Sequence, residues 1–507
     1  MSAAEETPLP PPHLLSHDPE IALRYRLARG AQVQWAELSV RARARRLGKA
    51  ADVLLERMED LADLIVEENG KPRVEAYGHE IGPSAAHVRY MCAQAPRLLV
   101  PRRFSPAVLP IREVTVTPVP LGVVLIISPW NVPLAIPFGQ AMAALLAGNA
   151  VVLKPSEVTP RIGDAIGEVF DACGLPPNLF SVVQGDGRVG ADLIAARPDK
   201  VLFTGSLATG RKVMAAAAAH PIPVSLELGG VDALVVCEDA DIEFASSAIA
   251  FGGAFNHGQI CASVERVLVH ETVREELVSR VVDKLAQVPA RDLGRVTFGM
   301  QRRVYDRHLQ DARERGLHIR CGGAWRDRDQ LEATVIEGEG IEDAPVWREE
   351  TFGPVVAVAT FRHDDEAIRK HDDCAFGLTA SVFTTSPERA EHYARRLRVG
   401  AVSINELGAS LHACGEVPWG GVEGSGFGRS HGQEGLLECT RPLVVDRPRW
   451  GLPSFKRPWW FPYDPHQRAL MADLARSVAH RSLRVRFGAR LRMGRALFRQ
   501  LVEHPRL

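Results

Sequence analysis

Residues 201–230 read VLFTGSLATGRKVMAAAAAHPIPVSLELGG and contain one complete strand–helix–strand unit. A short apolar run at 201–203 is followed by a turn at Gly205-Ser206, an alanine-rich helical segment at 207–219 and a second strand at 223–227. This alternation is typical of a parallel β-sheet whose strands are joined by crossover helices. We therefore expect Glu227 to end a buried strand.

The same alternation continues on both sides of this unit. Upstream, we predict strands at 113–117, 123–127, 150–153 and 180–183 and helices at 35–70, 133–146, 161–173 and 189–196. Downstream, strands at 232–236 and 265–269 flank a helix at 241–255, so the pattern restarts after Gly230. The fold class predicted is α/β, with two α/β domains.

Residues 114–153 contain no Asp, Glu, Lys or Arg, which resembles a membrane span. Prolines interrupt this segment repeatedly, and the prediction is instead buried strands and a core helix. The N-terminus has no basic start followed by an apolar run, so no signal peptide is expected.

The eight cysteines are spaced singly, without a C-x-x-C pair. In a chain of 507 residues this spacing indicates reduced thiols in a cytoplasmic protein, with neither a disulfide framework nor a metal site.

Three separated motifs supply the residue types of a covalent mechanism. Cys261 lies in FNHGQICAS (255–263), which is too polar and glycine-broken for a packed strand, so we expect this thiol to be accessible to a substrate. Asn131 follows Pro129-Trp130 and offers an amide for an oxyanion, and Glu227 offers a carboxylate base. Each residue alone has an ordinary alternative, namely a core cysteine, a turn asparagine and a structural carboxylate.

Several strand-to-helix turns are suited to a dinucleotide. Residues 185–190 match G-x-G-x-x-G, and Gly205-Ser206 precedes a helix whose N-terminal N–H groups favour a pyrophosphate. Lys154 and Glu157 close another strand, where ligands of open α/β sheets bind. A capped helix and a solvated turn are the alternatives for these segments.

Taken together, these segments resemble the aldehyde dehydrogenase superfamily over roughly residues 30–445. The motifs that carry the resemblance occur in family order: PWN (129–131), KPSE (154–157), FTGS (203–206), ELGG (227–230), GQIC (258–261), EETFGP (349–354), PWGG (418–421) and SGFGR (425–429).

The resemblance implies an NAD(P)-dependent enzyme of the hydrolytic type, with Cys261 as nucleophile, Glu227 as general base and Asn131 as oxyanion donor. It also implies a set of cofactor contacts: Lys154 and Glu157 at the adenosine ribose, Gly187 at the adenosine half, Gly205 and Ser206 at the pyrophosphate, Glu350 and Phe352 at the nicotinamide riboside, together with Trp130 and Gly210. No metal is implied.

The family's organisation implies domain boundaries and an oligomer. A discontinuous, Rossmann-like cofactor domain would comprise 1–107 and 121–227, and a catalytic α/β domain 228–435. Strands at 108–120 and 436–446 would form a small β extension that assembles a homodimer or homotetramer.

Cofactor and substrate preference follow from a few side chains. The carboxylate of Glu157 favours NAD, because it repels a 2′-phosphate, and NADP remains the alternative. Val132, Leu134, Ile136, Phe138 and Trp419 suggest an apolar tunnel, hence an aliphatic or aromatic aldehyde; core packing is the alternative for them.

Two other functions remain open from the sequence. A CoA-acylating dehydrogenase would release the thioester to CoA instead of water, which the presence of Glu227 disfavours. A scaffold that binds the cofactor or associates with a membrane would not need the Cys–Asn–Glu set.

Residues 447–507 form a basic tail outside these motifs. This segment has 14 Lys or Arg against three acids, so it carries about +11 while the rest carries about −12. We predict helix from 467 to 502, interrupted near Gly488 and Gly494. Packing on the acidic body or a neighbouring subunit, peripheral binding to anionic lipid and nucleic-acid binding are the three interpretations, with nucleic acid the least favoured.

Overall fold

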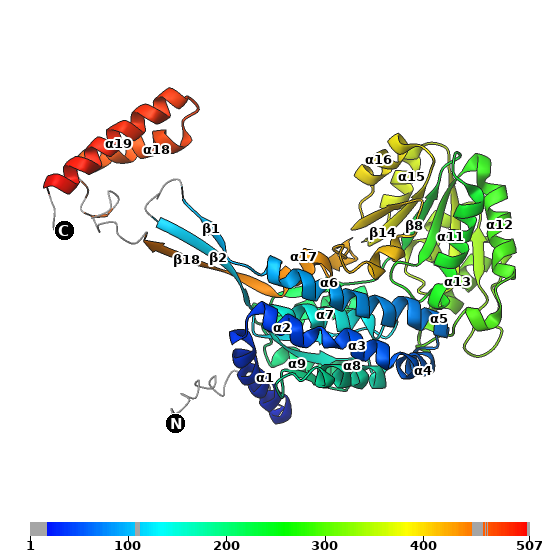
Figure 1. The fold of residues 1–507 in the computed structure, drawn as a ribbon. Helices are drawn as coiled ribbons and strands as arrows, with labels where there is room; N and C mark the ends of the chain where they lie inside the picture. The colour runs from blue at the N-terminus through cyan, green and yellow to red at the C-terminus, as the bar shows by residue number, and fades with distance from the viewer. Residues whose placement is uncertain (1–17, 107–111, 449–459, 462, 464, 504–507) are drawn as a thin grey trace. The chain divides into compact units, whose positions relative to one another are not determined.

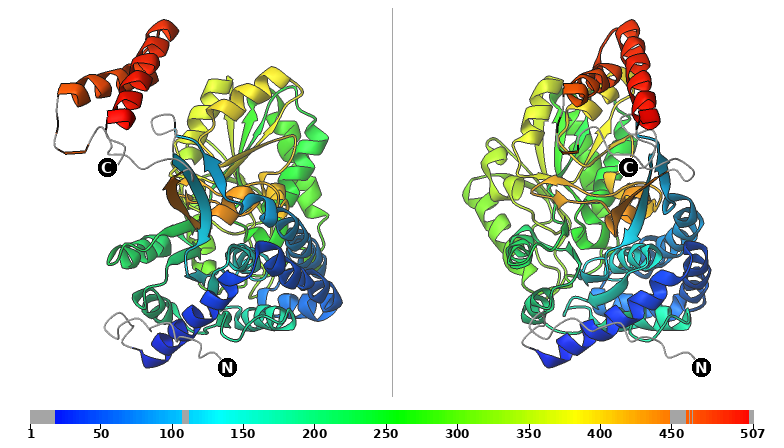
Figure 2. Two further views of the ribbon diagram at one scale, coloured as in Figure 1. Left: turned by 60° about the vertical axis from the view of Figure 1, so that its left-hand side comes forward. Right: turned by 90° about the vertical axis from the view of Figure 1, so that its left-hand side faces the viewer.

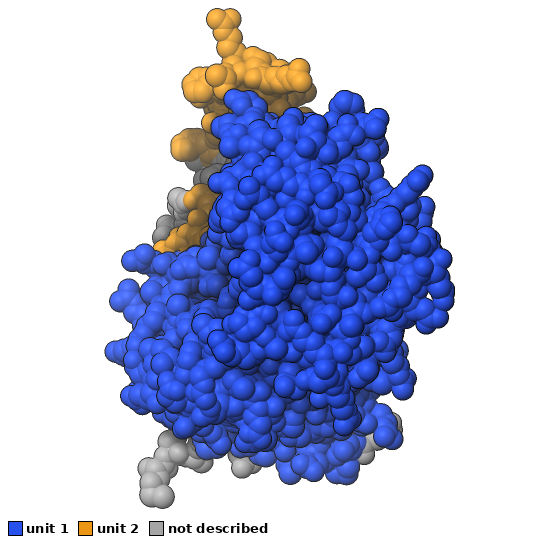
Figure 3. Space-filling view, turned by 90° about the vertical axis from the view of Figure 1, so that its right-hand side faces the viewer, with its two compact units in different colours: residues 1–99, 119–441 blue, residues 100–118, 442–507 orange. Residues whose placement is uncertain are grey.

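The structure is a computed structural model that describes residues 18–106, 112–448, 460–461, 463 and 465–503 (Figure 1). The chain divides into two compact units, residues 1–99 with 119–441 and residues 100–118 with 442–507 (Figure 3). The first unit contains two open sheets, and the second contains strands of a small sheet and a pair of helices. The α/β fold class predicted from the sequence is confirmed.

The first sheet has the strand order β17-β7-β6-β3-β4-β5. Its five parallel strands are β3 (Val123–Ile127), β4 (Ala150–Lys154), β5 (Phe180–Val182), β6 (Lys200–Thr204) and β7 (Val224–Glu227), and β17 (Gly426–Phe427) is antiparallel to β7. β3 and β4 are buried along their whole length, because a parallel sheet covered on both faces selects continuous apolar runs. The predicted strands agree to within one residue.

Helices cover both faces of this sheet (Figure 2). The crossover helices are α7 (Ala135–Ala147), α8 (Pro160–Ala172), α9 (Gly187–Ala195) and α10 (Leu207–Ala218), and the N-terminal helices are α1 (Pro19–Glu37), α2 (Val40–Leu47), α3 (Lys49–Glu56), α4 (Met58–Asn69), α5 (Arg73–Glu75) and α6 (Gly82–Leu98). All residues of α7 are buried, so the segment without charged residues is a core helix between buried strands, as predicted.

The strand register brings the ends of the parallel strands to one edge. Ile127 at the end of β3 lies opposite Lys154 on one side and Phe203 on the other. On the next strand pair, Thr204 lies opposite Glu227. The segments that follow β3, β4, β6 and β7 therefore begin at the same carboxyl edge, where open α/β sheets bind ligands.

The second sheet has the order β10-β11-β12-β9-β8-β14-β15. Its strands are β8 (Asp232–Val236), β9 (Val264–His270), β10 (His318–Cys321), β11 (Thr334–Glu337), β12 (Val355–Phe361), β14 (Thr379–Phe383) and β15 (Ala401–Ile404), of which only β10 runs antiparallel to its neighbour. Alternate residues of β8 belong to two hydrophobic cores. Ala233 and Val235 share a core with residues of α13 (Gln301–Glu314), whereas Leu234 and Val236 share one with residues of α11 (Ile242–Ala254).

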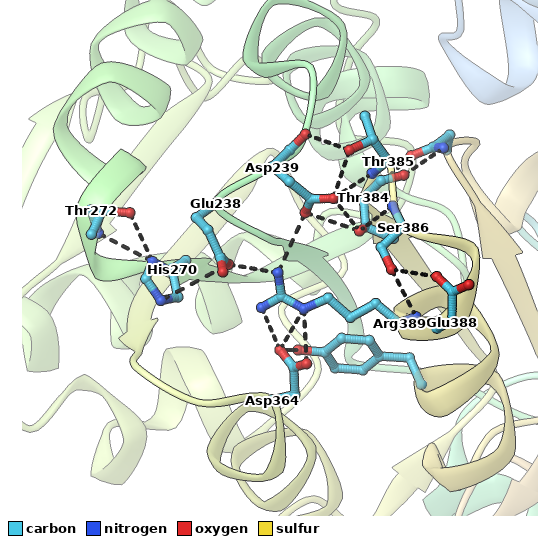
Figure 4. A network of polar contacts seen from close by, with 12 residues as sticks. Glu238, Asp239, His270, Thr272, Asp364, Thr384, Thr385, Ser386, Glu388 and Arg389 are labelled. Carbon is cyan, nitrogen blue, oxygen red and sulfur yellow. Dashed lines mark hydrogen bonds and ion pairs between the residues drawn. The ribbon is translucent and has the colours of Figure 1, made fainter.

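Ion pairs close the carboxyl edge of this second sheet (Figure 4). Arg389, on α16 (Pro387–Arg396), donates to both oxygens of Asp364 at 2.6–3.0 Å and lies 2.7 Å from Glu238. Asp239 accepts from Thr384 and from the backbone of Thr385 at 2.8 Å. These groups follow β8, β12 and β14, so the hydrogen-bonding and charged groups at this edge are paired with one another.

The small sheet consists of β1 (Arg102–Phe104), β2 (Arg112–Pro120) and β18 (Thr440–Pro448). The strand predicted at 436–446 begins later, because Gly432–Glu438 forms helix α17 and Leu436 is buried in the main core. Residues 108–111 of the other predicted strand lie outside the described residues.

The tail forms two helices in contact, α18 (Pro465–Ala479) and α19 (Leu483–Glu503) (Figure 1). The predicted breaks at Gly488 and Gly494 are wrong: the helix continues through both, since an interior glycine costs only about 1 kcal/mol. The break falls instead at 480–482, where the backbone N–H of Ser482 donates to His480 Nδ1. Among the described helices, none has an apolar stretch long enough to cross a bilayer.

We predict that Arg389→Met lowers the midpoint of thermal unfolding at neutral pH. The change leaves Asp364, Glu238 and Asp239 close together without their cation, and an unsatisfied partly buried acceptor costs about 1–3 kcal/mol. Arg395→Met is the matched control, because Arg395 lies on the same helix with an exposed partner, Glu391. Equal midpoints for the two variants would contradict the role assigned to Arg389.

Candidate active site

The loop that carries Cys261 is held in an unusual backbone conformation. Asn256, His257 and Gly258 have φ of +48°, +58° and +70°, three consecutive left-handed residues after α11. Such a conformation costs about 1–2 kcal/mol per non-glycine residue and persists only where its surroundings determine it. Phe255–Gly258 is buried, although this polar, glycine-containing stretch is unsuited to a packed strand.

Distant residues supply the contacts that hold this loop. Glu75 accepts the backbone N–H of Asn256 at 3.0 Å, and His257 Nε2 accepts the backbone N–H of Leu331 at 3.3 Å. The loop therefore depends on segments nearly 200 residues away in the sequence.

Cys261 is half-buried at the end of this loop. Burial raises the pKa of its thiol above the ordinary value, and the carboxyl groups of Asp232, Glu350 and Glu227 raise it further. Burial and neighbouring carboxyl groups both disfavour the thiolate form of Cys261.

Asn131 is tied directly to the nucleophile loop. Its amide nitrogen donates to the backbone oxygen of Gln259 at 3.1 Å, two residues before Cys261. Its backbone oxygen accepts from Lys71 at 3.0 Å and from the amide of Asn256 at 3.1 Å. A side-chain amide has two N–H groups, and this bond uses one of them.

A buried ion pair stabilises the segment that carries Asn131. The side chains of Lys71 and Glu80 are almost completely buried, and Lys71 Nζ lies 2.6 Å from Glu80 Oε1. The other oxygen of Glu80 accepts the backbone N–H groups of Leu134 and Ala135 at 3.0 and 2.9 Å, at the start of α7. The pair thus fixes the segment that carries Asn131 at both of its ends.

Glu227 is a buried carboxyl group at the end of β7, and its Oε2 has no hydrogen-bond partner among the described residues. Burial raises its pKa well above the ordinary value; Arg429 lowers it in part, and Glu438 raises it. A carboxyl group in this state takes up a proton readily.

Cys261 and Glu227 line the same hollow. It has about 400 Å³ of atom-free space, part of which is open to solvent. Its wall includes the apolar residues Ile136, Leu228, Leu378 and Trp419 and the polar residues Gln140, Thr204, His412, Ser430 and His431. The structure therefore brings the nucleophile candidate and the base candidate to one cavity, and Asn131 is hydrogen-bonded to the loop that carries Cys261.

The predicted cofactor residues follow the carboxyl edge of the first sheet. Lys154, which ends β4, donates to Glu157 at 3.0 Å, and the Glu157 side chain is more than half exposed. Ser206 is the N-cap of α10 and is exposed, with its hydroxyl accepting the backbone N–H of Thr209. Gly187 begins α9, and a Cβ there would meet no atom within 4 Å. Two helix N-termini with free space are suited to an anionic dinucleotide.

Gly205 and Gly210 have packing roles in addition. A Cβ at Gly205 would lie 2.7 Å from the ring of Phe203, and one at Gly210 would lie 2.6 Å from Leu228. Gly210 is buried, so its place among the cofactor contacts stays a prediction, while its contact with Leu228 explains why no larger side chain fits there.

Glu350 and Phe352 lie in the loop between α14 (Pro345–Arg348) and β12 of the second sheet. Glu350 accepts the backbone N–H of Gly230 at 3.1 Å, and burial raises its pKa to about 8. Phe352 has a φ of +53°. The centroids of its ring and of the Trp130 ring lie 5.4 Å apart, in an edge-to-face arrangement. Glu265 accepts the backbone N–H of Phe352 at 2.7 Å and holds this strained residue in place.

Sequence reasoning missed a cluster of three histidines beside the hollow. The rings of His87 and His412 lie 4.8 and 5.0 Å from that of His431, and burial lowers the pKa of all three. His431 has φ +63° and ψ 173°, a region that is almost exclusive to glycine. The histidines are too far apart in sequence for spacing to reveal the cluster. Lys71, Glu80 and Glu265 were missed for the same reason.

Comparisons with known proteins agree on one family. The model of the "Aldehyde dehydrogenase family" matches residues 16–445. A curated relative, 4,4'-diapolycopene aldehyde oxidase of a Methylomonas species, is 40% identical over 86% of this chain and 83% of its own length.

Two solved structures have a similar fold. An NAD-dependent aldehyde dehydrogenase from Sinorhizobium meliloti has a TM-score of 0.81 and 33% identity, covering 87% of this chain and 89% of that one. An indole-3-acetaldehyde dehydrogenase in complex with NAD+ has a TM-score of 0.80 and 28% identity, covering 85% and 89%.

We predict that Glu80→Ala lowers the midpoint of thermal unfolding strongly. The substitution leaves Lys71 as a buried, unpaired cation and removes two hydrogen bonds at the start of α7, and breaking a buried pair costs about 3–5 kcal/mol. Glu276→Ala, which removes an exposed partner of Arg280, is the control and is expected to unfold like the wild type. A Glu80→Ala protein as stable as this control would contradict the supporting role of the pair.

Proposed function

Because the chain belongs to the aldehyde dehydrogenase family, whose members are NAD(P)-dependent oxidoreductases that convert aldehydes to acids, we propose that Cys261, Asn131 and Glu227 carry this reaction here. The observation that supports the assignment is the shared hollow: Cys261 and Glu227 line it, and Asn131 is hydrogen-bonded to the loop of Cys261. The three groups can therefore act on one substrate without a movement of one domain against the other.

The first step forms a bond between Cys261 Sγ and the aldehyde carbon. The carbonyl oxygen becomes an oxyanion, to which an N–H of Asn131 donates, and the thiol proton passes to water in the part of the hollow that is open to solvent. Burial and the neighbouring carboxyl groups raise the pKa of this thiol, so they disfavour loss of the proton.

A nicotinamide cofactor held near Trp130, Glu350 and Phe352 would supply the hydride acceptance that converts the oxyanion adduct into a thioester on Cys261. Glu227 then removes a proton from a water molecule, and that water attacks the thioester carbon. The C–S bond breaks, the thiol recovers a proton, and the acid leaves. The unpartnered Oε2 of Glu227 and its raised pKa suit a group that must accept a proton.

We assign the cofactor to the carboxyl edge of the first sheet, in a domain of residues 1–107 and 121–227, with catalysis on 228–435. Lys154 and Glu157 hold the adenosine ribose, Gly187 lies at the adenosine half, Gly205, Ser206 and Gly210 lie at the pyrophosphate, and Trp130, Glu350 and Phe352 lie toward the nicotinamide. The closed edge of the second sheet supports this choice, since Arg389 and its carboxylate partners fill it. The exposed carboxylate of Glu157 favours NAD over NADP.

The substrate we propose is an apolar aldehyde, aliphatic or aromatic. Ile136, Leu228, Leu378 and Trp419 contribute apolar surface to the hollow, which has no fixed cation for a second carboxylate among the residues that line it. The curated relative whose name gives a diapolycopene aldehyde as its substrate supports an apolar chain.

Assembly and location are proposals of the same kind. β18 presents Leu443, Val444 and Val445 to solvent, with 37–60% of each residue exposed, and an exposed apolar strand is typical of an assembly surface. We assign it to a homodimer or homotetramer. We also assign the enzyme to the cytoplasm, with the basic tail as a peripheral membrane contact.

We predict that Cys261→Ala abolishes aldehyde oxidation, because alanine has no thiol to form the thioester. The measurement is NADH absorbance with a panel of aldehydes, with NAD and NADP in parallel and without CoA. Cys414→Ala, at an exposed cysteine, is the control and should retain full activity. Full activity of Cys261→Ala would exclude the mechanism, turnover only with CoA would indicate an acylating enzyme, and absence of activity in the wild type would favour a binding scaffold.

Glu227→Gln should separate the two halves of the reaction. We expect the first burst of NADH to persist, while steady-state turnover decreases about 10²–10⁴-fold. The exposed Glu391 provides the control substitution Glu391→Gln, which should change neither phase.

The pH dependence follows from the raised pKa of Glu227. The base must be ionised to activate water, so steady-state turnover should increase with pH through a pKa above the ordinary carboxyl range. Glu227→Gln should lose this limb while its burst remains. A burst that disappears together with turnover would show that Glu227 is needed before thioester formation.

A further inference from the structure

The tail helix α19 has two faces of different character. At 100° per residue, Leu483, Phe487, Leu491 and Phe498 fall within an arc of roughly 80° and span about 22 Å along the helix. All four are exposed, by 75%, 65%, 50% and 70% respectively. We call these four residues the apolar stripe.

The opposite face of α19 already has its partner. Ala489 is fully buried and Val485 and Met493 are half-buried on that side, where α19 contacts α18 (Figure 2). Arg492 forms an ion pair with Asp473 of α18 at 2.7 Å, and Arg486 donates to the backbone oxygen of Ser477. The apolar stripe is therefore not needed to join the two helices.

Arginines border the apolar stripe on both sides. By the same angular spacing, Arg490 lies along one border and Arg484 and Arg495 along the other. All three are exposed, and none forms an ion pair with a residue that the structure describes. Residues 465–503 contain nine arginines and two acids, Asp473 and Glu503.

An apolar stripe with cations on both borders matches the boundary of an anionic bilayer. Phe and Leu side chains enter the acyl region, while arginine stems extend along the apolar surface and their guanidinium groups contact phosphates. The exposed aromatic residues Trp460, Phe461 and Tyr463 precede α18 and are of the kind that favours the headgroup region. Phosphate contact with a nucleic acid would use the arginines but leave the stripe without a function.

We propose that α19 binds the surface of an anionic membrane through Leu483, Phe487, Leu491 and Phe498, with Arg484, Arg490 and Arg495 contacting lipid phosphates. This inference deepens the peripheral membrane contact proposed above and rests on it. The family model ends at residue 445, so this surface is an addition to the shared enzyme fold. It places the enzyme where apolar aldehydes dissolve.

The test measures partitioning of the full-length protein onto vesicles by co-sedimentation. Vesicles of phosphatidylcholine alone are compared with vesicles of equal parts phosphatidylcholine and phosphatidylglycerol, at low and high salt. We expect binding to the anionic vesicles that weakens with salt and little binding to the neutral ones. Oxidation of water-soluble benzaldehyde is measured in parallel, so that loss of membrane binding is distinguished from failure of the proposed reaction.

Two variants address the two components of the surface. Replacing Arg484, Arg490 and Arg495 by Gln should weaken partitioning about a hundredfold, since each cation near an anionic surface contributes about fivefold. Phe487→Ser with Leu491→Ser should weaken it as well, through lost apolar burial. Both variants should keep helical circular dichroism and benzaldehyde oxidation.

The charge-matched control replaces Arg291, Arg328 and Arg395 by Gln, which are exposed arginines outside the tail. This control should bind vesicles like the wild type. Wild-type protein that ignores anionic vesicles, or equal losses in the tail variant and the control, would overturn the proposal. A change of molecular mass in Phe487→Ser/Leu491→Ser without a change in vesicle binding would assign the stripe to a second copy, and arginine-dependent binding of duplex DNA without vesicle binding would assign it to nucleic acid.

Discussion

The parallel register of the first sheet is the constraint on which the proposed chemistry depends. Because Ile127, Lys154 and Phe203 are level with one another, and Thr204 with Glu227, the segments that follow four strands begin at one edge. Asn131, Glu157, Ser206 and the Glu227 carboxyl group thus come from four distant parts of the sequence to one side of the sheet. A shift of one residue in any strand would turn each of its side chains to the opposite face of the sheet and move the group that follows it by about 3.3 Å.

Buried polar groups then set the fine geometry that the sheet alone cannot supply. Lys71 and Glu80 hold the Asn131 segment, Glu75 holds the loop of Cys261, and Glu265 holds Phe352. In each case a side chain satisfies backbone groups in an otherwise costly conformation. Such groups must be paired when buried, so the site is rigid because any loosening leaves a polar atom unsatisfied.

Local sequence signals predicted the sheets well and the loops poorly. β3 and β8 have the predicted bounds, because each is a short apolar run between turn residues. The identities of Cys261, Asn131 and Glu227 were visible as motifs; Cys261 and Glu227 line one cavity, and Asn131 is hydrogen-bonded to the loop that carries Cys261. The burial of Phe255–Gly258 and the strained backbone of His431 were not visible, since both depend on partners far away in sequence. The strand that the resemblance implied from residue 436 begins at Thr440, because residues 436–438 still belong to helix α17.

The environment of Cys261 has a consequence for the chemical durability of the enzyme. Peroxides and alkylating agents react with thiolates, and burial, with the carboxyl groups of Asp232, Glu350 and Glu227, raises the pKa of this thiol and so disfavours its thiolate form. The burial that slows the first chemical step therefore also slows these side reactions, in contrast to an exposed thiol such as that of Cys414.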